Sequence, residues 1–285
     1  EYRRKAALQP SDYVFPFEAE AISVLQSAIA ANASDARAPY YLGNLLYDWQ
    51  PEEAVTLWEK ASLLDPGQAV TWRNLAIAYS HREGDDQKYK AIACLEKAIA
   101  LPNPYPTHFA ELDQLYKSVG ASVEKRLALL EKFEKVVSRK DEALGSMINL
   151  KIFAGKSNEA IALMENRIFS IREGGSAFNT GQAWANAHLT RGMKYFASRK
   201  YKQALADFQS ALTAPENLRA EGRNPRMAQL HYWIGNAYDA LGDKVKAREA
   251  WTAATLTDVQ PLSRRWFDNS QAQKYFITLA QKNLD

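Results

Sequence analysis

Cysteine and long apolar runs are nearly absent from this sequence. One cysteine, Cys94, occurs in 285 residues, which excludes an internal disulfide and a cysteine-based zinc site. No apolar stretch approaches the ~20 residues that cross a bilayer, so we expect no membrane association. Proline (11) and glycine (13) are too scarce for a loop-rich β protein or a long disordered linker. These absences leave a helical protein as the expectation, with Cys94 as a small buried side chain of a helix.

The sequence also lacks a marked excess of charge of either sign. The chain has 36 basic and 33 acidic residues, a net charge of +3, and no long run of lysine and arginine. We therefore expect no nucleic-acid partner. No signal peptide is recognisable, but the sequence begins at Glu1 without a methionine and is expected to be a piece of a longer protein. The compartment stays open, with a soluble cytoplasmic location favoured over a periplasmic one.

What the sequence does contain is an internal repeat, and repeats decide the fold before any other signal. In each copy a first segment carries a large residue, a leucine-like residue, a small residue and a second large residue, in that order. A second segment then carries a small, a large and a small residue. The copies are Leu42-Gly43-x2-Leu46 with Ala54-x3-Trp58-x2-Ala61; Trp72-x2-Leu75-Ala76-x2-Tyr79 with Ala91-x3-Leu95-x2-Ala98; His188-x3-Gly192-x2-Tyr195 with Ala204-x3-Phe208-x2-Ala211; and His231-x2-Ile234-Gly235-x2-Tyr238 with Ala247-x3-Trp251-x2-Ala254.

This order resembles the tetratricopeptide (TPR) repeat, a hairpin of helices A and B. The apolar spacing of 3–4 residues predicts helices. The small residues fall where helices A and B must approach closely, and the large residues of helix B fill the wedge toward the next hairpin. We therefore expect an all-α, TPR-type solenoid, a right-handed superhelix of hairpins with a capping helix at each end.

Weaker copies complete the array. Phe109 to Tyr116 reads as a helix A followed by a helix B at 127–137, and Leu144 with Ala160 marks a further hairpin. A glycine-containing stretch around Gly174 interrupts the period, either as an ordinary connector or as a loop that contacts another domain. The expected organisation is an N-terminal linker (1–17), a front array of a capping helix and about four hairpins (18–170), a connector loop (171–183), a back pair of hairpins (184–261) and a C-terminal capping helix (262–285).

A more particular resemblance covers nearly the whole chain. It rests on segments 12–16, 36–48, 70–75, 111–116, 126–131 and 173–175. Together they resemble the C-terminal half of a large, uncharacterised bacterial family in which a mutarotase-like β-supersandwich precedes a TPR array. The resemblance implies that this chain is the TPR half and that a longer parent protein is a possible carbohydrate-active enzyme. It implies no catalytic residue in this stretch.

Signals of chemistry are weak. The four histidines lie far apart, without the spacing of metal ligands, and no phosphate-binding loop or nucleophile elbow occurs. We therefore predict no catalytic residue, metal or cofactor in this chain. His188 and His231 occupy a large packing position of their repeats, and Trp58, Trp72 and Trp251 fall on packing positions rather than on a sugar-binding platform.

The concave side of helix A is where TPR arrays usually bind extended peptides. Asn44 and Asn74 match the two asparagines that grip a ligand backbone in the carboxylate-binding subclass, but Tyr40, Thr107 and Glu111 stand where its basic residues would be. We therefore do not expect recognition of an acidic C-terminus. The candidate groove residues are Arg37, Tyr40, Asn44, Tyr47, Arg73, Asn74, Tyr232 and Asn236.

Two functions follow from these patterns. The first is a non-catalytic scaffold whose groove binds a protein segment or its own upstream domain. The alternative is an accessory part, a lid or an oligomerisation arm, of a multidomain carbohydrate-active enzyme. The expected partners are therefore a protein segment or upstream domain, with carbohydrate reached only through the parent enzyme and a homo-oligomer as a further possibility.

Overall fold

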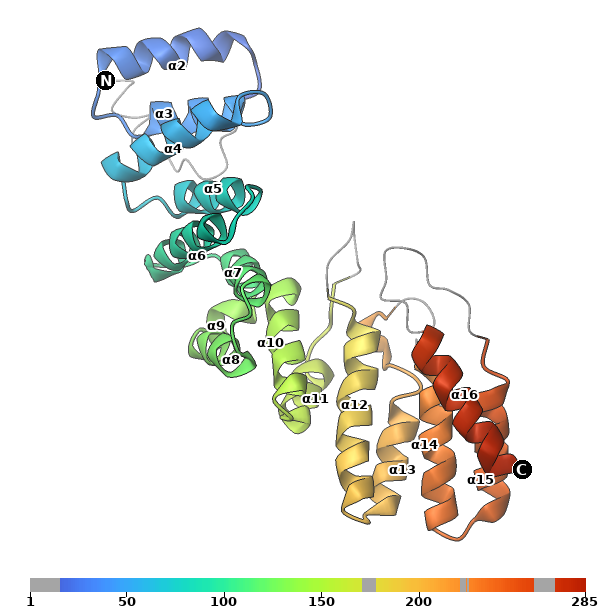
Figure 1. Cartoon of the computed structure of the whole chain (residues 1–285). Coiled ribbons are helices and arrows are strands. Elements are labelled where there is room, and N and C mark those ends of the chain that lie inside the picture. Colours follow the sequence, from blue (N-terminus) through green and yellow to red (C-terminus); the bar gives the residue numbers. More distant parts are fainter. Residues whose placement is uncertain (1–15, 171–177, 221–223, 225, 259–269) are drawn as a thin grey trace. The chain divides into compact units, whose positions relative to one another are not determined.

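The structure is a computed structural model that describes residues 16–170, 178–220, 224, 226–258 and 270–285. Within these residues the regular structure is entirely helical, which confirms the all-α prediction (Figure 1). The contacts divide the chain into two compact units. Unit 1 comprises residues 1–122 and 133–137, and unit 2 comprises residues 123–132 and 138–285.

Unit 1 is a stack of helical pairs that begins with a single helix. Each helix packs on the next, so that the pairs α3–α4 and α5–α6 are stacked between α2 and α7. The helices are α2 (Glu20–Ala31), α3 (Arg37–Leu46), α4 (Pro51–Leu64), α5 (Ala69–Ser80), α6 (Asp85–Ala100), α7 (Pro106–Ser118) and α9 (Glu134–Val137).

Unit 2 contains the remaining pairs and ends with a single helix. The pairs α10–α11, α12–α13 and α14–α15 pack in chain order, α8 packs on α10, and α16 lies across both α14 and α15 (Figure 1). The helices are α8 (Val123–Lys132), α10 (Asp141–Phe153), α11 (Ser157–Glu165), α12 (Thr180–Ala197), α13 (Tyr201–Ser210), α14 (Met227–Ala240), α15 (Lys244–Thr255) and α16 (Ser270–Leu284), with a 3-10 turn η1 (Glu216–Leu218).

Local sequence explains where several helices begin. Pro51 opens α4 and Pro106 opens α7, at a position where a missing N–H costs nothing. The side chain of Asn179 accepts a hydrogen bond from the first turn of α12, and Asp243 does the same for α15. Such caps satisfy backbone donors that the helix itself leaves unpaired.

The small residues of the repeat lie at the predicted close approaches. A Cβ on Gly43 would come within 2.5 Å of Trp58 on α4, and one on Gly235 within 2.4 Å of Trp251 on α15. Both indole side chains are almost completely buried, as the repeat pattern predicted. Cys94 is buried too, and burial raises the pKa of its thiol to about 11.

The predicted helix over residues 127–137 is wrong as a single element. It is interrupted at Phe133, which separates α8 from α9. The ring of Phe133 packs on Phe109 of unit 1, with 4.9 Å between ring centroids, while α8 packs on α10 of unit 2. Because the two halves of the segment pack in different units, the helical pattern does not continue through it.

The ends of the array also differ in detail from the sequence pattern. Ile22, Leu25 and Ile29 of α2 pack on the first hairpin, as expected of a cap. In α16, Phe276 packs on Tyr232, but the side chain of Tyr275 is 60% exposed rather than packed. Residues 171–177, Trp266 and Phe267 lie outside the described residues, and α12 already begins at Thr180, inside the expected connector.

Candidate functional site

Two asparagines join the first two A helices of unit 1. The side-chain oxygen of Asn44 on α3 accepts a hydrogen bond from the amide of Asn74 on α5, at 2.8 Å. The same oxygen accepts from the indole N–H of Trp58 on α4, at 3.0 Å. Asn44 therefore links three helices, and the two asparagines predicted to grip a peptide do lie together.

The orientation of this amide pair is determined by chemistry. An indole N–H is only a donor, so the atom of Asn44 that faces Trp58 must be the oxygen. The Asn44 nitrogen then points elsewhere; it is buried and has no hydrogen-bond partner among the residues that the structure describes. A buried donor without a partner costs about 1–3 kcal/mol, so this group is a candidate for ligand contact.

The last hairpin of unit 2 repeats the arrangement. Asn236 on α14 accepts hydrogen bonds from the indole of Trp251 at 3.1 Å and from Asn283 of α16 at 3.2 Å. The ring of Tyr232 lies 5.6 Å from that of Phe276, centroid to centroid. Tyr232 and Asn236 are thus in contact with the C-terminal helix, which differs from the open groove position expected for them.

Tyr40 is the clearest correction to the predicted groove. Its side chain is fully buried, its carbonyl accepts from the Trp58 indole at 3.3 Å, and its ring packs on that of Tyr41. Arg37 is the first residue of α3, where its backbone N–H donates to the Asp35 carboxylate at 2.9 Å. Tyr40 is therefore a core residue, while Arg37 stays half-buried at the start of the helix.

Tyr47 lies at the opposite end of α3. Its ring packs on Trp58, with 5.0 Å between centroids, and its hydroxyl lies 3.3 Å from the His81 side chain. Burial, followed by the charge of Asp48, raises the pKa of Tyr47. Sequence reasoning missed His81, because it follows α5 in a connection without a repeat position.

Arg73 is not an unpaired cation. Its guanidinium forms a bidentate ion pair with Glu111 of α7, at 2.6–2.9 Å. Both side chains are about one-third exposed, at 36% and 31%. Arg73, one of the predicted groove residues, thus has its charge neutralised by Glu111 in this conformation.

His188 is buried, as its repeat position predicted, but it is also hydrogen-bonded. It lies 2.8 Å from the carboxylate of Asp207, which accepts from Arg191 as well. Burial tends to raise the pKa of Asp207, and the hydrogen bonds from His188 and Arg191 outweigh it, so the pKa is lowered. This network joins α12 to α13 and has a packing role.

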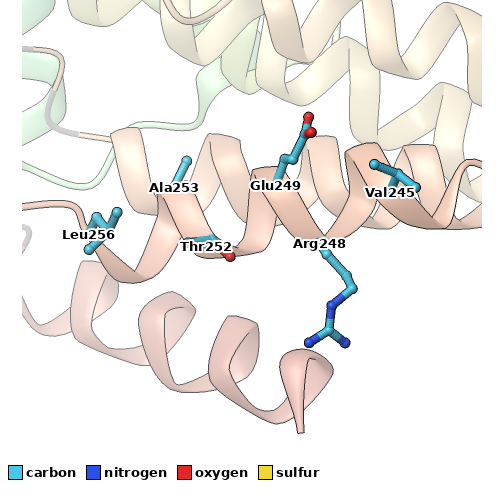
Figure 2. A pocket seen from close by; sticks show the side chains of 6 residues that line it. All are labelled: Val245, Arg248, Glu249, Thr252, Ala253 and Leu256. Atoms are coloured by element: carbon cyan, nitrogen blue, oxygen red, sulfur yellow. The ribbon is translucent and has the colours of Figure 1, made fainter.

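A shallow pocket is present on the outer face of α15, and the side chains that line it come from that helix and from Leu256, which follows it (Figure 2). Its two ends are apolar, with Val245 and Leu256 70% and 78% exposed. Figure 2 shows the carboxylate of Glu249 and the guanidinium of Arg248 pointing to opposite sides of the helix. The polar groups do not converge, so the pocket does not define a binding site.

The described residues contain no group of three or more His, Cys, Asp or Glu side chains placed to hold a metal ion. No helix among them combines the length and apolarity that crossing a membrane requires.

Solved structures similar to this chain include TPR proteins. The Naa15/Naa10 complex bound to HypK-THB is 13% identical over 92% of this chain and 36% of that chain, with a TM-score of 0.51. A tetratricopeptide repeat protein from Parabacteroides merdae is 15% identical over 91% of each chain (TM-score 0.41). YrrB, described as a TPR protein with an unusual peptide-binding site, is 17% identical over 92% of this chain and 99% of that chain (TM-score 0.36).

No protein-family model matches the chain. At these identities the likeness concerns the fold alone, and it agrees with the stacked helical pairs described above. The fold is that of a TPR-type helical-repeat protein. The relation to a mutarotase-linked family, and the accessory role in a carbohydrate-active enzyme, stay predictions.

Proposed function

We propose that this chain is a non-catalytic interaction module that binds an extended segment of a partner protein across α3 and α5. The observation that carries the proposal is the hydrogen-bonded pair of Asn44 and Asn74. An upstream domain of the same polypeptide is one source of such a segment.

The pair has unused hydrogen-bonding capacity of both kinds. Asn44 retains its amide donor, and Asn74 retains its side-chain oxygen, for which the described residues supply no hydrogen bond. A peptide group needs one donor and one acceptor from its binding site. The hydrogen bond of 2.8 Å between Asn74 Nδ2 and Asn44 Oδ1 holds both side chains in a fixed orientation. They match this need with little loss of conformational entropy on binding.

The surroundings favour a backbone ligand over a charged one. The Arg73 guanidinium is neutralised by Glu111, and the Tyr47 hydroxyl is held by His81. A ligand carboxylate would compete with Glu111 for its partner. We therefore expect an extended peptide bound mainly through its main chain, with Tyr47 and Arg37 at the two ends of α3.

The test begins with peptides selected on the immobilised chain from a short-peptide phage library. Their affinity for Asn74→Ala, measured by calorimetry, should be about tenfold lower, because one or two hydrogen bonds of about 0.5–1.5 kcal/mol are lost. Asn283→Ala is the matched control: it removes the equivalent internal bond to Asn236 without touching the proposed site. Equal affinities for Asn74→Ala and Asn283→Ala would place the peptide site elsewhere.

A further inference from the structure

Arg226 lies at the start of α14 in unit 2, in contact with two side-chain amides. The guanidinium donates through Nε to the side-chain oxygen of Asn186 on α12. It donates through Nη1 to the side-chain oxygen of Gln229, one turn into α14, at 2.9 Å. The side chain is thereby held in place by two neutral amides, with further N–H groups of the guanidinium left over.

No carboxylate pairs with this guanidinium among the residues that the structure describes. Arg191 in the same unit has Asp207 at 2.6 Å, and Arg167 likewise pairs with Asp141. Burial lowers the pKa of Arg226, and no acid in the described part of the chain offsets that effect. A partly buried arginine stays charged, and no described residue supplies a counter-ion for its positive charge.

Gln273 of α16 adds an independent observation. Its side-chain oxygen accepts from the backbone N–H of Ala228 at 2.9 Å and of Gln229 at 3.4 Å, which places the side chain at the N-terminus of α14. Its amide nitrogen is buried and has no partner in the described part of the chain, and the residue is 6% exposed. This buried donor therefore belongs to a side chain that contacts the first turn of α14, the helix that Arg226 precedes.

The cluster therefore has a surplus of donors. The oxygens of Asn186, Gln229 and Gln273 are all used, so each amide has its N–H2 group left for other contacts. The N-terminus of α14 carries the positive end of the helix dipole, which disfavours a cation and favours an anion. A group that only accepts hydrogen bonds and carries negative charge would satisfy every one of these features.

We propose that this cluster, formed by Arg226, Asn186, Gln229 and Gln273, is a binding site for a carboxylate of a peptide ligand. The N–H groups that remain on Nη1 and Nη2 of the guanidinium can donate two parallel hydrogen bonds to a planar carboxylate. The site belongs to unit 2 and uses none of the residues of the Asn44–Asn74 pair, so either proposal stands or fails without the other.

The experiment follows the Arg226 Nε–H resonance by NMR while defined probes are added. The probes are acetyl-trialanine with a free carboxylate, its C-terminal amide, acetyl-aspartate amide, and inorganic phosphate at matched ionic strength. We expect saturable shifts with the free acid or with the aspartate derivative, and none with the amide. A response to the free acid alone assigns a chain terminus, and a response to the aspartate derivative assigns an acidic side chain.

Variants separate binding from packing. Arg226→Gln should abolish the response seen at neighbouring backbone amides, and Arg226→Lys should weaken it about tenfold by losing the bidentate geometry. Arg248→Gln, at an exposed arginine of the same unit, should leave it unchanged. Because no described carboxylate compensates the charge, Arg226→Gln should retain or raise the melting temperature, whereas a purely structural arginine would lower it.

Several results would overturn the proposal. These are equal responses to the free acid and the amide, a stronger response to phosphate than to either carboxylate, or no saturable response from the wild-type chain. If Arg226→Gln fails to fold, the comparison of free acid with amide on the wild-type chain still decides the question.

Discussion

Gly43→Ala should destabilise the first hairpin, although alanine is the better helix former. A Cβ at this position would lie 2.5 Å from Nε1 and 2.7 Å from Cδ1 of Trp58. The indole cannot easily retreat, because its N–H is bonded to Asn44 and to the Tyr40 carbonyl. The backbone oxygen of Ala54, 3.1 Å from the added methyl group, restricts a shift in the other direction.

The magnitude follows from two opposing effects. Replacing glycine by alanine inside a helix ordinarily gains about 1 kcal/mol. Overpacking a buried site costs about 1–3 kcal/mol, and disturbing the indole hydrogen bond to Asn44 adds about 1 kcal/mol. We therefore expect Gly43→Ala to lower the free energy of unfolding by about 1–3 kcal/mol.

A double-mutant cycle with Trp58→Leu tests this reasoning. The second hairpin already has alanine at the equivalent place, Ala76, opposite Leu95, and both are buried. With leucine at position 58, Gly43→Ala should become neutral or stabilising by up to about 1 kcal/mol. Urea unfolding monitored by circular dichroism gives the free energies, and hydrogen exchange localises them to α3 and α4. A stabilising Gly43→Ala in the wild-type background would refute the close-approach argument.

Three other outcomes are expected. Burial lowers the pKa of His108 to about 4, so the unfolded chain binds the proton more readily than the folded chain. The free energy of unfolding should therefore fall, by up to about 3 kcal/mol, as the pH drops from about 6.5 to 4. Urea midpoints measured over this range should lose most of that slope in His108→Leu; an unaltered slope would exclude His108 as its source. Gln273→Ala removes the cap of α14 and should cost about 1 kcal/mol, with faster hydrogen exchange in the first turn; unchanged exchange would contradict the cap. Asp207→Asn leaves the guanidinium of Arg191 poorly paired and should cost about 2 kcal/mol in urea unfolding, so a neutral result would show that the network contributes no stability.

Much of the fold could be predicted because packing positions repeat. The small residues and the large aromatic residues of the hairpins are buried where the pattern put them, as Trp58 and Trp251 illustrate. The prediction of a single helix over residues 127–137 failed at Phe133 for a physical reason. Periodicity shows which side of a segment is apolar, but not that its two halves pack in different units.

The candidate site was predicted less well. Asn44 and Asn74 were identified and lie together, but Tyr40 was assigned to the open side and is completely buried. A helix places neighbouring side chains about 100° apart, so Tyr40 and Tyr41 point in different directions. Local spacing does not say which of the two is buried. The ion pair of Arg73 was not predicted, because its partner, Glu111, comes from another hairpin and local spacing does not show it.

One pattern in the sequence does predict the hydrogen bond between asparagine and the indole of tryptophan. Asparagine follows the small residue of helix A in the two hairpins whose helix B carries tryptophan, as at Asn44 and Asn236. In the hairpins that carry Leu95 or Phe208 instead, apolar residues occupy that place. Only an indole N–H needs an acceptor there, so the pairing within a single sequence already indicates a hydrogen bond.

The cap that Gln273 supplies to α14 has a consequence for synthesis of the chain. The capping oxygen lies 45 residues beyond the backbone N–H that it satisfies. At a translation rate of about 5–20 residues per second, the N-terminus of α14 waits about 2–9 s for its acceptor. Helices α12 and α15 need no such delay, because Asn179 and Asp243 are made just before the turns they cap. The last hairpin should therefore be the latest part of the nascent chain to become resistant to proteases.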